Sequence, residues 1–153
     1  MRSSADRLTA ARLLMRVDDG AFSSRLLAGG ASSGVRSRVM EVLRWQGAVD
    51  ALLQKRCKRR LPALDPEVRT TLRLGLVEVM RLEVPPALAT DSAVRLVRRL
   101  GKSSAAGMVN AVLRAAAASW RDDLTSRPLY ERLAHPRWIV DRWSEFYLSL
   151  IHI

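Results

Sequence analysis

The chain has 153 residues, of which 26 are Lys or Arg and 15 are Asp or Glu, giving a formal net charge of +11. Its length suits one domain, and 48% apolar residues are enough for a core, which excludes wholesale disorder. One cysteine excludes a disulfide scaffold and a multi-cysteine metal site. No apolar run approaches the roughly 20 residues of a membrane-spanning helix, and the N-terminus lacks a secretory signal. We therefore expect a soluble cytoplasmic protein with no membrane partner.

The positive charge is almost entirely arginine, with 23 Arg and only 3 Lys. Guanidinium groups bind phosphates in a planar, bidentate way and can stack on bases. Because neutralising phosphates releases counterions, a small chain with this charge is expected to attract nucleic acid. The alternative is that a GC-rich genome encodes arginine often and that these side chains only solvate helix faces. The clustering of the charge favours a polyanion partner.

The first half of the chain has the spacing of amphipathic helices, and no run alternates as a strand does. In the first segment, apolar residues fall at i, i+3, i+4 and i+7, namely Ala10, Leu13, Leu14 and Val17. Residues 18–20 end this helix, a short apolar piece follows at 22–27, and residues 29–34 predict a flexible turn. A long helix is expected over 35–53. It ends in a basic run at 55–60, since cations favour a helix C-terminus.

A further helix is expected after residue 65. Asp65 and Pro66 are typical of a helix start, as a cap and as a first-turn residue. Gly75 lies within the apolar stripe of that helix, where glycine is unfavourable by roughly 1 kcal/mol relative to alanine. We therefore predict that Gly75 marks a close crossing with another helix. Two prolines at 85–86 break the run.

The remaining helices complete one domain. One helix is expected over 88–100, and a last one begins at a cap provided by Ser103 or Ser104. The composition of the chain then changes to a short, Trp-rich stretch. We interpret residues 1–121 as one helical domain and residues 122–147 as a linker to something else.

The sequence contains no catalytic constellation. Cys57 is the only thiol; neighbouring cations could lower its pKa, but no histidine lies near it, so we interpret it as a bystander. His135 stands alone and is interpreted as a packing residue of the linker. No glycine-rich phosphate loop or nucleophile-elbow motif is present. We therefore predict no catalytic, cofactor-binding or metal-ligating residue, and a binding module.

Three basic groups are the candidate RNA-binding residues. Those of the N-terminal helix are Arg7, Arg12 and Arg16; those of the basic run are Lys55, Arg56, Lys58, Arg59 and Arg60; those of the later helix are Arg95, Arg98, Arg99 and Lys102. The last four are expected on adjoining turns of one helix side. Such contacts would position RNA without reading its sequence. With 5% aromatics, a base-stacking platform is not expected.

Several strings together resemble the NusB-like domain family. They are VLRW at 42–45, LDP at 64–66, LRLG at 72–75, VPP at 84–86, AV at 93–94 and, most specifically, VNAVLR at 109–114. The resemblance implies an all-α fold, a NusB-like helical bundle made of two packed three-helix bundles. The number of helices predicted from the apolar spacing agrees with that fold.

This domain occurs in two contexts, and the tail distinguishes them. Residues 133–143, LAHPRWIVDRW, resemble the linker that leads into the catalytic part of RsmB/Sun rRNA 5-methylcytosine methyltransferases. That resemblance implies rRNA as partner, with the catalytic cysteines and S-adenosyl-L-methionine in a later domain that this chain lacks. The alternative is a free-standing NusB-like antitermination factor that binds RNA and a ribosomal protein. A third interpretation is a module whose basic face binds an acidic protein.

The sequence departs from the family pattern in two places. The His and Asn-Glu that usually follow the double proline are here Ala87 and Asp91-Ser92, so no role of that His or Glu is carried over to this chain. The last six residues, 148–153 (LSLIHI), are apolar and uncharged, and back-translated they match a sequencing adaptor. We expect them to be a non-native tail; the alternative is a real, short apolar helix or strand.

Overall fold

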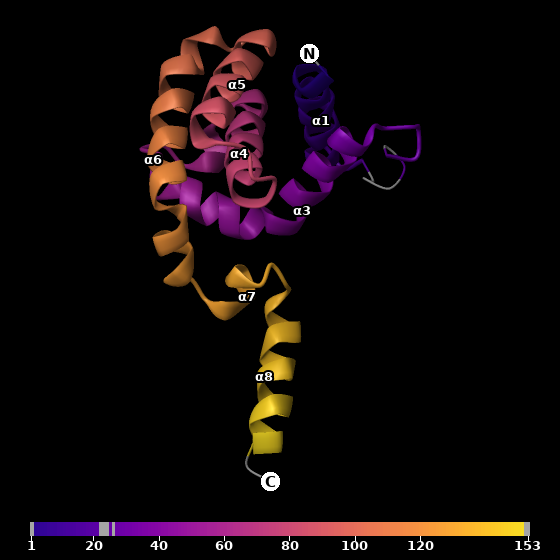
Figure 1. Ribbon diagram of the computed structural model, residues 1–153, viewed down its shortest axis with the longest axis vertical. Coiled ribbons are helices and arrows are strands. Elements are labelled where there is room, and N and C mark those ends of the chain that lie inside the picture. Colours follow the sequence, from indigo (N-terminus) through magenta and orange to yellow (C-terminus); the bar gives the residue numbers. More distant parts are fainter. Residues whose placement is uncertain (1, 22–24, 26, 152–153) are drawn as a thin grey trace.

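The computed structural model describes residues 2–21, 25 and 27–151, and every regular element among them is helical, as expected (Figure 1). The bundle helices are α1 (Arg2–Asp18), α3 (Ser33–Gln54), α4 (Pro66–Arg81), α5 (Pro86–Arg99) and α6 (Ala106–Thr125). Two 3-10 turns, η1 (Leu61–Ala63) and η2 (Ser103–Ala105), precede α4 and α6, and α7 (Leu129–Arg132) and α8 (Arg137–Ile151) follow. The apolar piece expected at 22–27 falls largely on positions outside the described residues.

Helix α4 is the centre of the bundle. It packs against α1 and α3 on one side and against α5 and α6 on the other, and the residues from Thr70 to Glu78 are all buried. Its apolar side chains join those of the four surrounding helices in one continuous core, which includes Leu52, Leu72, Val97 and Val109. Burial of this apolar area is the main force that holds the helices together.

Gly75 marks the predicted close crossing. A Cβ atom at this position would lie 2.6 Å from Leu113 Cδ1 of α6 and 3.4 Å from the Cβ of Ala93 of α5. Because any side chain would have to displace a core leucine, only glycine fits without movement. The crossing brings α4, α5 and α6 together as one three-helix group.

Helix starts differ from the sequence-based expectation at several positions. Ser32 caps α3, since its Oγ accepts a hydrogen bond from the Val35 N–H (3.2 Å), so the expected turn at 29–34 ends earlier. Asp65 precedes α4 but makes no capping bond, and its carboxylate lies 3.2 Å from Lys102 Nζ instead. Helix α5 begins at Pro86, two residues before the expected start, because proline suits a first turn.

The expected cap of α6 is also absent. Ser103 and Ser104 form part of the 3-10 turn η2, and no side chain caps α6, which begins at Ala106. The helix then continues without a break across the expected domain boundary at 121–122 and ends at Thr125. Its last turns are therefore one rigid element with the bundle.

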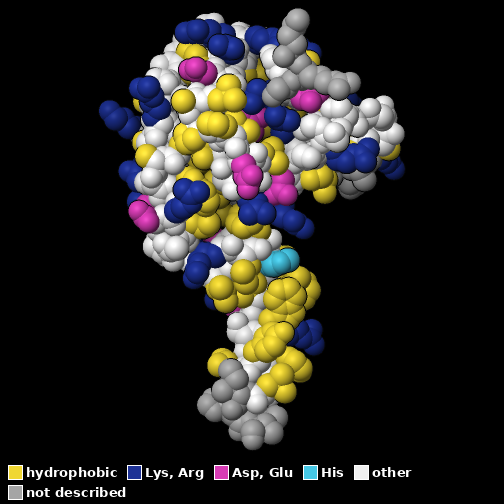
Figure 2. Space-filling model, in the orientation of Figure 1, with side chains coloured by type: hydrophobic (Ala, Val, Ile, Leu, Met, Phe, Trp, Pro, Cys, Tyr) yellow, Lys and Arg dark blue, Asp and Glu magenta, His cyan; other side chains and the backbone are white. Residues whose placement is uncertain are grey.

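The C-terminal part extends away from the bundle (Figure 1). Helix α7 packs on α3 and α6, and α8 packs on α7. His135 lies between them, with its ring edge-on to Trp143 at a centroid distance of 5.3 Å. Large apolar side chains remain exposed along α8 (Figure 2), including Trp138 at 66% and Phe146 at 62%. No described helix has the length and hydropathy that crossing a bilayer requires.

Candidate nucleic-acid interface

Arg7, one of the expected RNA contacts, is buried in the bundle. Its Nε lies 2.7 and 3.0 Å from the two carboxylate oxygens of Glu78, and its side chain is 9% exposed. Arg38 Nε donates to the same carboxylate at 2.7 Å. Glu78 is 1% exposed, and the two guanidinium groups give its buried carboxylate hydrogen-bond partners of opposite charge. This burial argues against a phosphate contact through the Nε edge of Arg7.

The other two cations expected on the first helix are exposed. Arg12 and Arg16 lie on the outer face of α1, one turn apart. Neither forms an ion pair with any residue that the structure describes. They remain candidates for phosphate contact.

The basic run after α3 divides into a tethered and an untethered part. Lys55 Nζ lies 2.7 Å from Asp123 Oδ1, and Arg56 Nη2 lies 3.1 Å from Asp123 Oδ2 and 2.7 Å from Ser119 Oγ. The hydrogen bonds from Lys55, Ser119 and Arg56 lower the pKa of Asp123 to about 2. Lys55 and Arg56 thus tie the end of α3 to the end of α6 and are partly neutralised there.

Lys58, Arg59 and Arg60 form the untethered part. All three are exposed, and the described residues include no ion-pair partner for them. A cavity of about 410 Å³ lies beside them and is lined by cations (Arg56, Lys58, Arg59) and by apolar side chains (Leu64, Met108, Ala111, Val112). Cys57 also lines it; burial raises the pKa of this thiol, opposite to the lowering that the neighbouring cations suggested.

The third group occupies α5. Arg95, Arg98 and Arg99 are exposed on this helix, and Arg99 Nη1 donates to Ser4 Oγ of α1 at 3.1 Å. Lys102 does not extend their row as expected, because α5 ends at Arg99 and Lys102 lies beyond it, paired with Asp65. Three cations, rather than four, share this surface.

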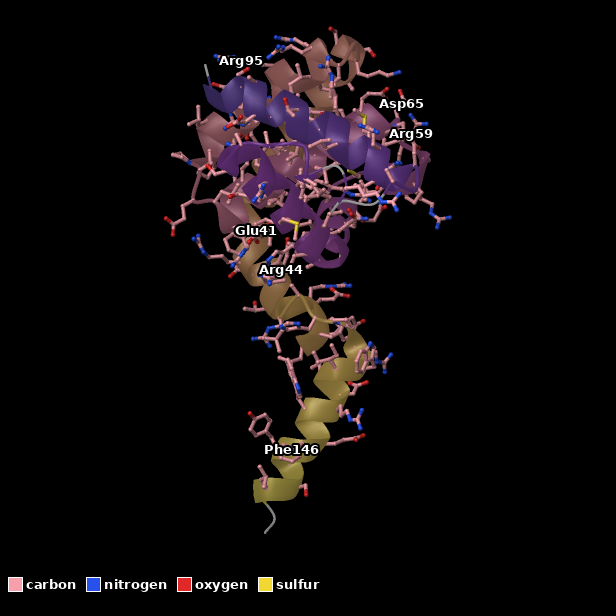
Figure 3. The ribbon with its side chains drawn as sticks, turned by 90° about the vertical axis from the view of Figure 1, so that its right-hand side faces the viewer. Glu41, Arg44, Arg59, Asp65, Arg95 and Phe146 are labelled. Atoms are coloured by element: carbon pink, nitrogen blue, oxygen red, sulfur yellow. The ribbon has the colours of Figure 1, made fainter. Side chains whose placement is uncertain are left out.

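The exposed candidate residues therefore lie in separate groups, on α1, at residues 58–60 and on α5. Figure 3 shows Arg95 and Arg59 on opposite sides of the bundle in that view. The i, i+4 spacing of Arg95 and Arg99 indicated a shared helix side, but not that this side faces Ser4 and Arg7 of α1 across a cavity. Within the described ranges, no group of three or more His, Cys, Asp or Glu side chains is placed to hold a metal ion.

The NusB family model matches residues 4–118, from the first turn of α1 to the later turns of α6. The chain belongs to the NusB family. Two solved NusB structures have the same fold. That of T. maritima NusB gives a TM-score of 0.68 at 19% identity, over 76% of this chain and 90% of that one. The solution structure of Aquifex aeolicus NusB gives 0.67 at 24%, over 85% and 98%. The all-helical NusB-like bundle is thereby confirmed.

A third similar structure is described as the crystal structure of a plectonemic RNA supercoil. Its matching chain gives a TM-score of 0.69 at 26% identity, over 83% of this chain and 100% of that one.

Among curated proteins, the chain resembles two kinds of NusB-family relative. Ribosomal RNA small subunit methyltransferase B of Xanthomonas campestris pv. campestris is 37% identical over 73% of this chain and 28% of its own length. The Xylella fastidiosa (strain Temecula1) protein of that name is 32% identical over 92% of this chain and 35% of its own length. Transcription antitermination protein NusB of Saccharopolyspora erythraea is 46% identical, but over only 35% of this chain and 36% of its own. The chain spans about a quarter to a third of the methyltransferases it matches.

Proposed function

We propose that this chain is the RNA-binding N-terminal domain of an S-adenosyl-L-methionine-dependent 16S rRNA 5-methylcytosine methyltransferase. Its role is to dock rRNA so that a separate catalytic domain reaches one cytosine. In this proposal, residues 1–121 are the RNA-binding domain, residues 122–147 are the linker, and residues 148–153 are the non-native tail. The place of action in this proposal is the cytoplasm.

The extent of the similarity to the methyltransferases carries the proposal. A match over 92% of the chain must continue well past residue 118, where the NusB family match ends, and so must include part of the α7–α8 region. The match to the antitermination protein covers only about a third of the chain. The α7–α8 region is therefore common to this chain and a methyltransferase relative.

The chemistry of methyl transfer is assigned to the part of the relatives that this chain does not cover. Attack on cytosine C6 needs a thiolate, and S-adenosyl-L-methionine supplies the methyl group. The raised pKa of Cys57 makes its thiol a poor nucleophile. We therefore place catalysis and cofactor outside this chain.

The exposed side of α8 supports a linker role. Trp138, Trp143 and Phe146 are each at least 47% exposed on a helix that packs on α7. Exposed apolar faces of this kind usually mark a surface that another structure covers. In the proposal, the catalytic domain of the same protein covers it.

The exposed cations without ion-pair partners support the RNA-binding part. Lys58, Arg59, Arg95, Arg98 and Arg99 stand outside ion pairs with the described acids, so they are available to release counterions from a nucleic acid. Titration of a labelled single-stranded RNA at several salt concentrations tests this. We expect affinity to fall steeply as salt rises. Affinity that is absent at low salt, or insensitive to salt, would contradict RNA docking.

The alternative is a free-standing antitermination factor that binds RNA and a ribosomal protein. The 46% identity to the NusB protein of Saccharopolyspora erythraea, which extends over 35% of this chain, favours this alternative. The native reading frame separates the two. A cofactor-binding fold with paired catalytic cysteines downstream of Tyr147 supports the methyltransferase, whereas a stop codon there supports the factor.

A third interpretation is a module whose basic surfaces bind an acidic protein. If RNA does not compete with an acidic protein for the basic surfaces, the module instead binds proteins.

A further inference from the structure

We propose that the cavity between α1 and α5 is a phosphate-binding pocket that holds one backbone phosphate of the bound RNA. This inference rests on the RNA-binding function proposed above and assigns one of its contacts to a particular place. The pocket is about 240 Å³ in volume and is lined by Ser4, Arg7, Leu88, Ser92, Arg95, Leu96 and Arg99. Three of these residues are arginines, two are serines, and none is an acid.

The two helices bring these groups together from opposite walls. Arg95 and Arg99 lie one turn apart on α5, so they point to the same side of the helix. Ser4 and Arg7 lie within the first two turns of α1, and the bond from Arg99 Nη1 to Ser4 Oγ (3.1 Å) spans the two helices. A hydrogen bond therefore joins the two walls of the pocket.

The electrostatics of the pocket favour an anion. Like charges one turn apart destabilise a helix, and here the described residues provide no carboxylate that pairs with Arg95 or Arg99. Glu78, the buried acid bonded to Arg7 of the lining, is also bonded to the guanidinium group of Arg38. The positive end of the α1 dipole adds to the field, since Ser4 lies in its first turn. The C-terminal end of α5 opposes this field, but Arg98 and Arg99 offset it there.

The donor set selects a phosphate among anions. Guanidinium forks match phosphate oxygens bidentately, and serine hydroxyls can donate to the remaining oxygens. A backbone phosphate carries two non-bridging oxygens and two ester oxygens around a tetrahedral phosphorus, so its acceptors can face both walls at once. The exposed Leu88 at the rim gives an apolar surface for the sugar next to that phosphate.

The test compares two double variants that remove the same charge. Arg95→Gln/Arg99→Gln changes the pocket, while Arg132→Gln/Arg142→Gln removes two exposed arginines from α7 and α8. Arg7 is left intact because it holds Glu78. Binding of a labelled single-stranded RNA is measured from about 50 mM to about 200 mM salt. We expect the pocket variant to lose about tenfold in affinity and to reduce the salt slope by about 0.7, the value of one phosphate on a single strand. The control variant should change affinity less than twofold.

A second arm uses inorganic phosphate and separates failure of the pocket from failure of RNA binding. Millimolar phosphate should raise the Tm of the wild type and of the control variant, relative to chloride at equal ionic strength, but not that of the pocket variant. If RNA binds the wild type and both double variants lose affinity equally, the pocket inference is wrong and the RNA-binding function stands. If the wild type binds no RNA, the proposed function is wrong. In that case, a rise in Tm with phosphate that the wild type and the control variant show and the pocket variant lacks assigns the pocket to free phosphate. If phosphate raises the Tm of none of these proteins, the pocket inference is overturned.

Discussion

Arginines inside the bundle and arginines on its surface have different partners. At the junction of α1, α3 and α4, Arg7 and Arg38 converge on Glu78, and Arg73 of α4 binds both carboxylate oxygens of Asp50 at 2.7 and 2.8 Å. On α5, Arg95 and Arg98 are exposed and have no carboxylate partner among the described residues. The same residue type therefore stabilises the fold in one region and is available for an anionic ligand in the other.

The difference shows that a net charge of +11 is not a measure of binding capacity. A buried guanidinium whose hydrogen bonds go to a carboxylate contributes structure, and replacing its partner leaves an uncompensated charge in the interior. An exposed guanidinium costs little to replace but can release a counterion when it meets a phosphate. The next three predictions test this division.

The largest effect is expected at Glu78. Glu78→Gln removes the carboxylate that two buried guanidinium groups share, so we expect the free energy of unfolding to fall by about 3–5 kcal/mol. Urea denaturation at neutral pH measures this. Glu145→Gln, on the exposed part of α8, is the control and should change stability by less than about 0.5 kcal/mol. Equal effects of the two substitutions would remove the distinction between the regions.

A smaller difference is expected between two arginine substitutions. Arg73→Gln breaks the bidentate bond to Asp50 and the 3.4 Å contact with Asp18, and we expect a loss of about 2 kcal/mol. Arg98→Gln should leave stability within about 0.5 kcal/mol of the wild type and should weaken RNA binding instead. Thermal unfolding and RNA titration of both variants measure the two effects. A stable Arg73 variant, or an unstable Arg98 variant, would argue against the division.

The smallest effect concerns Asp123, where Lys55 and Arg56 belong to neither class because they are exposed yet paired. The pKa of Asp123 is lowered from an ordinary value of 3.8 to about 2. The ionised form is therefore favoured in the folded state, and its stabilising contribution is complete above 3.8 and lost as the pH falls towards 2.

The wild type should accordingly be more stable than Asp123→Asn at neutral pH, and this difference should shrink between about pH 4 and pH 2. Urea denaturation at each pH measures it. Asp141→Asn, in an exposed pair with Arg137, serves as the control and should show a smaller change. A wild-type advantage that persists unchanged at pH 2 would show that the Asp123 pairs do not hold the ends of α3 and α6 together.

Much of the fold could be predicted because it depends on local patterns. The 3.6-residue spacing of apolar residues gave the bundle helices, and a glycine inside an apolar stripe indicated the crossing of α4 with α6. Helix starts were predicted less well, because a competing partner decides whether a side chain caps. Asp65, which pairs with Lys102 instead of capping α4, is the clearest case.

The functional surfaces were less predictable because they depend on contacts between distant segments. Arg7 is a cation on a basic helix, which is typical of an RNA contact. Only the fold shows that its partner is Glu78, 71 residues away. Lys102 falls outside its expected row because α5 ends three residues before it. The pocket between α1 and α5 needs both helices in place, so neither segment alone indicates it.

Mapping of RNA contacts onto individual backbone amides by NMR tests the central claim most directly. A single-stranded RNA is titrated into the labelled chain at low salt, and chemical-shift changes are followed for every assigned amide. We predict the largest changes at residues 58–60 and 95–99, with small changes along α8 and around the buried Arg73. Changes that are largest on α8, or that spread evenly over all arginines, would contradict the assignment of RNA docking to these two surfaces.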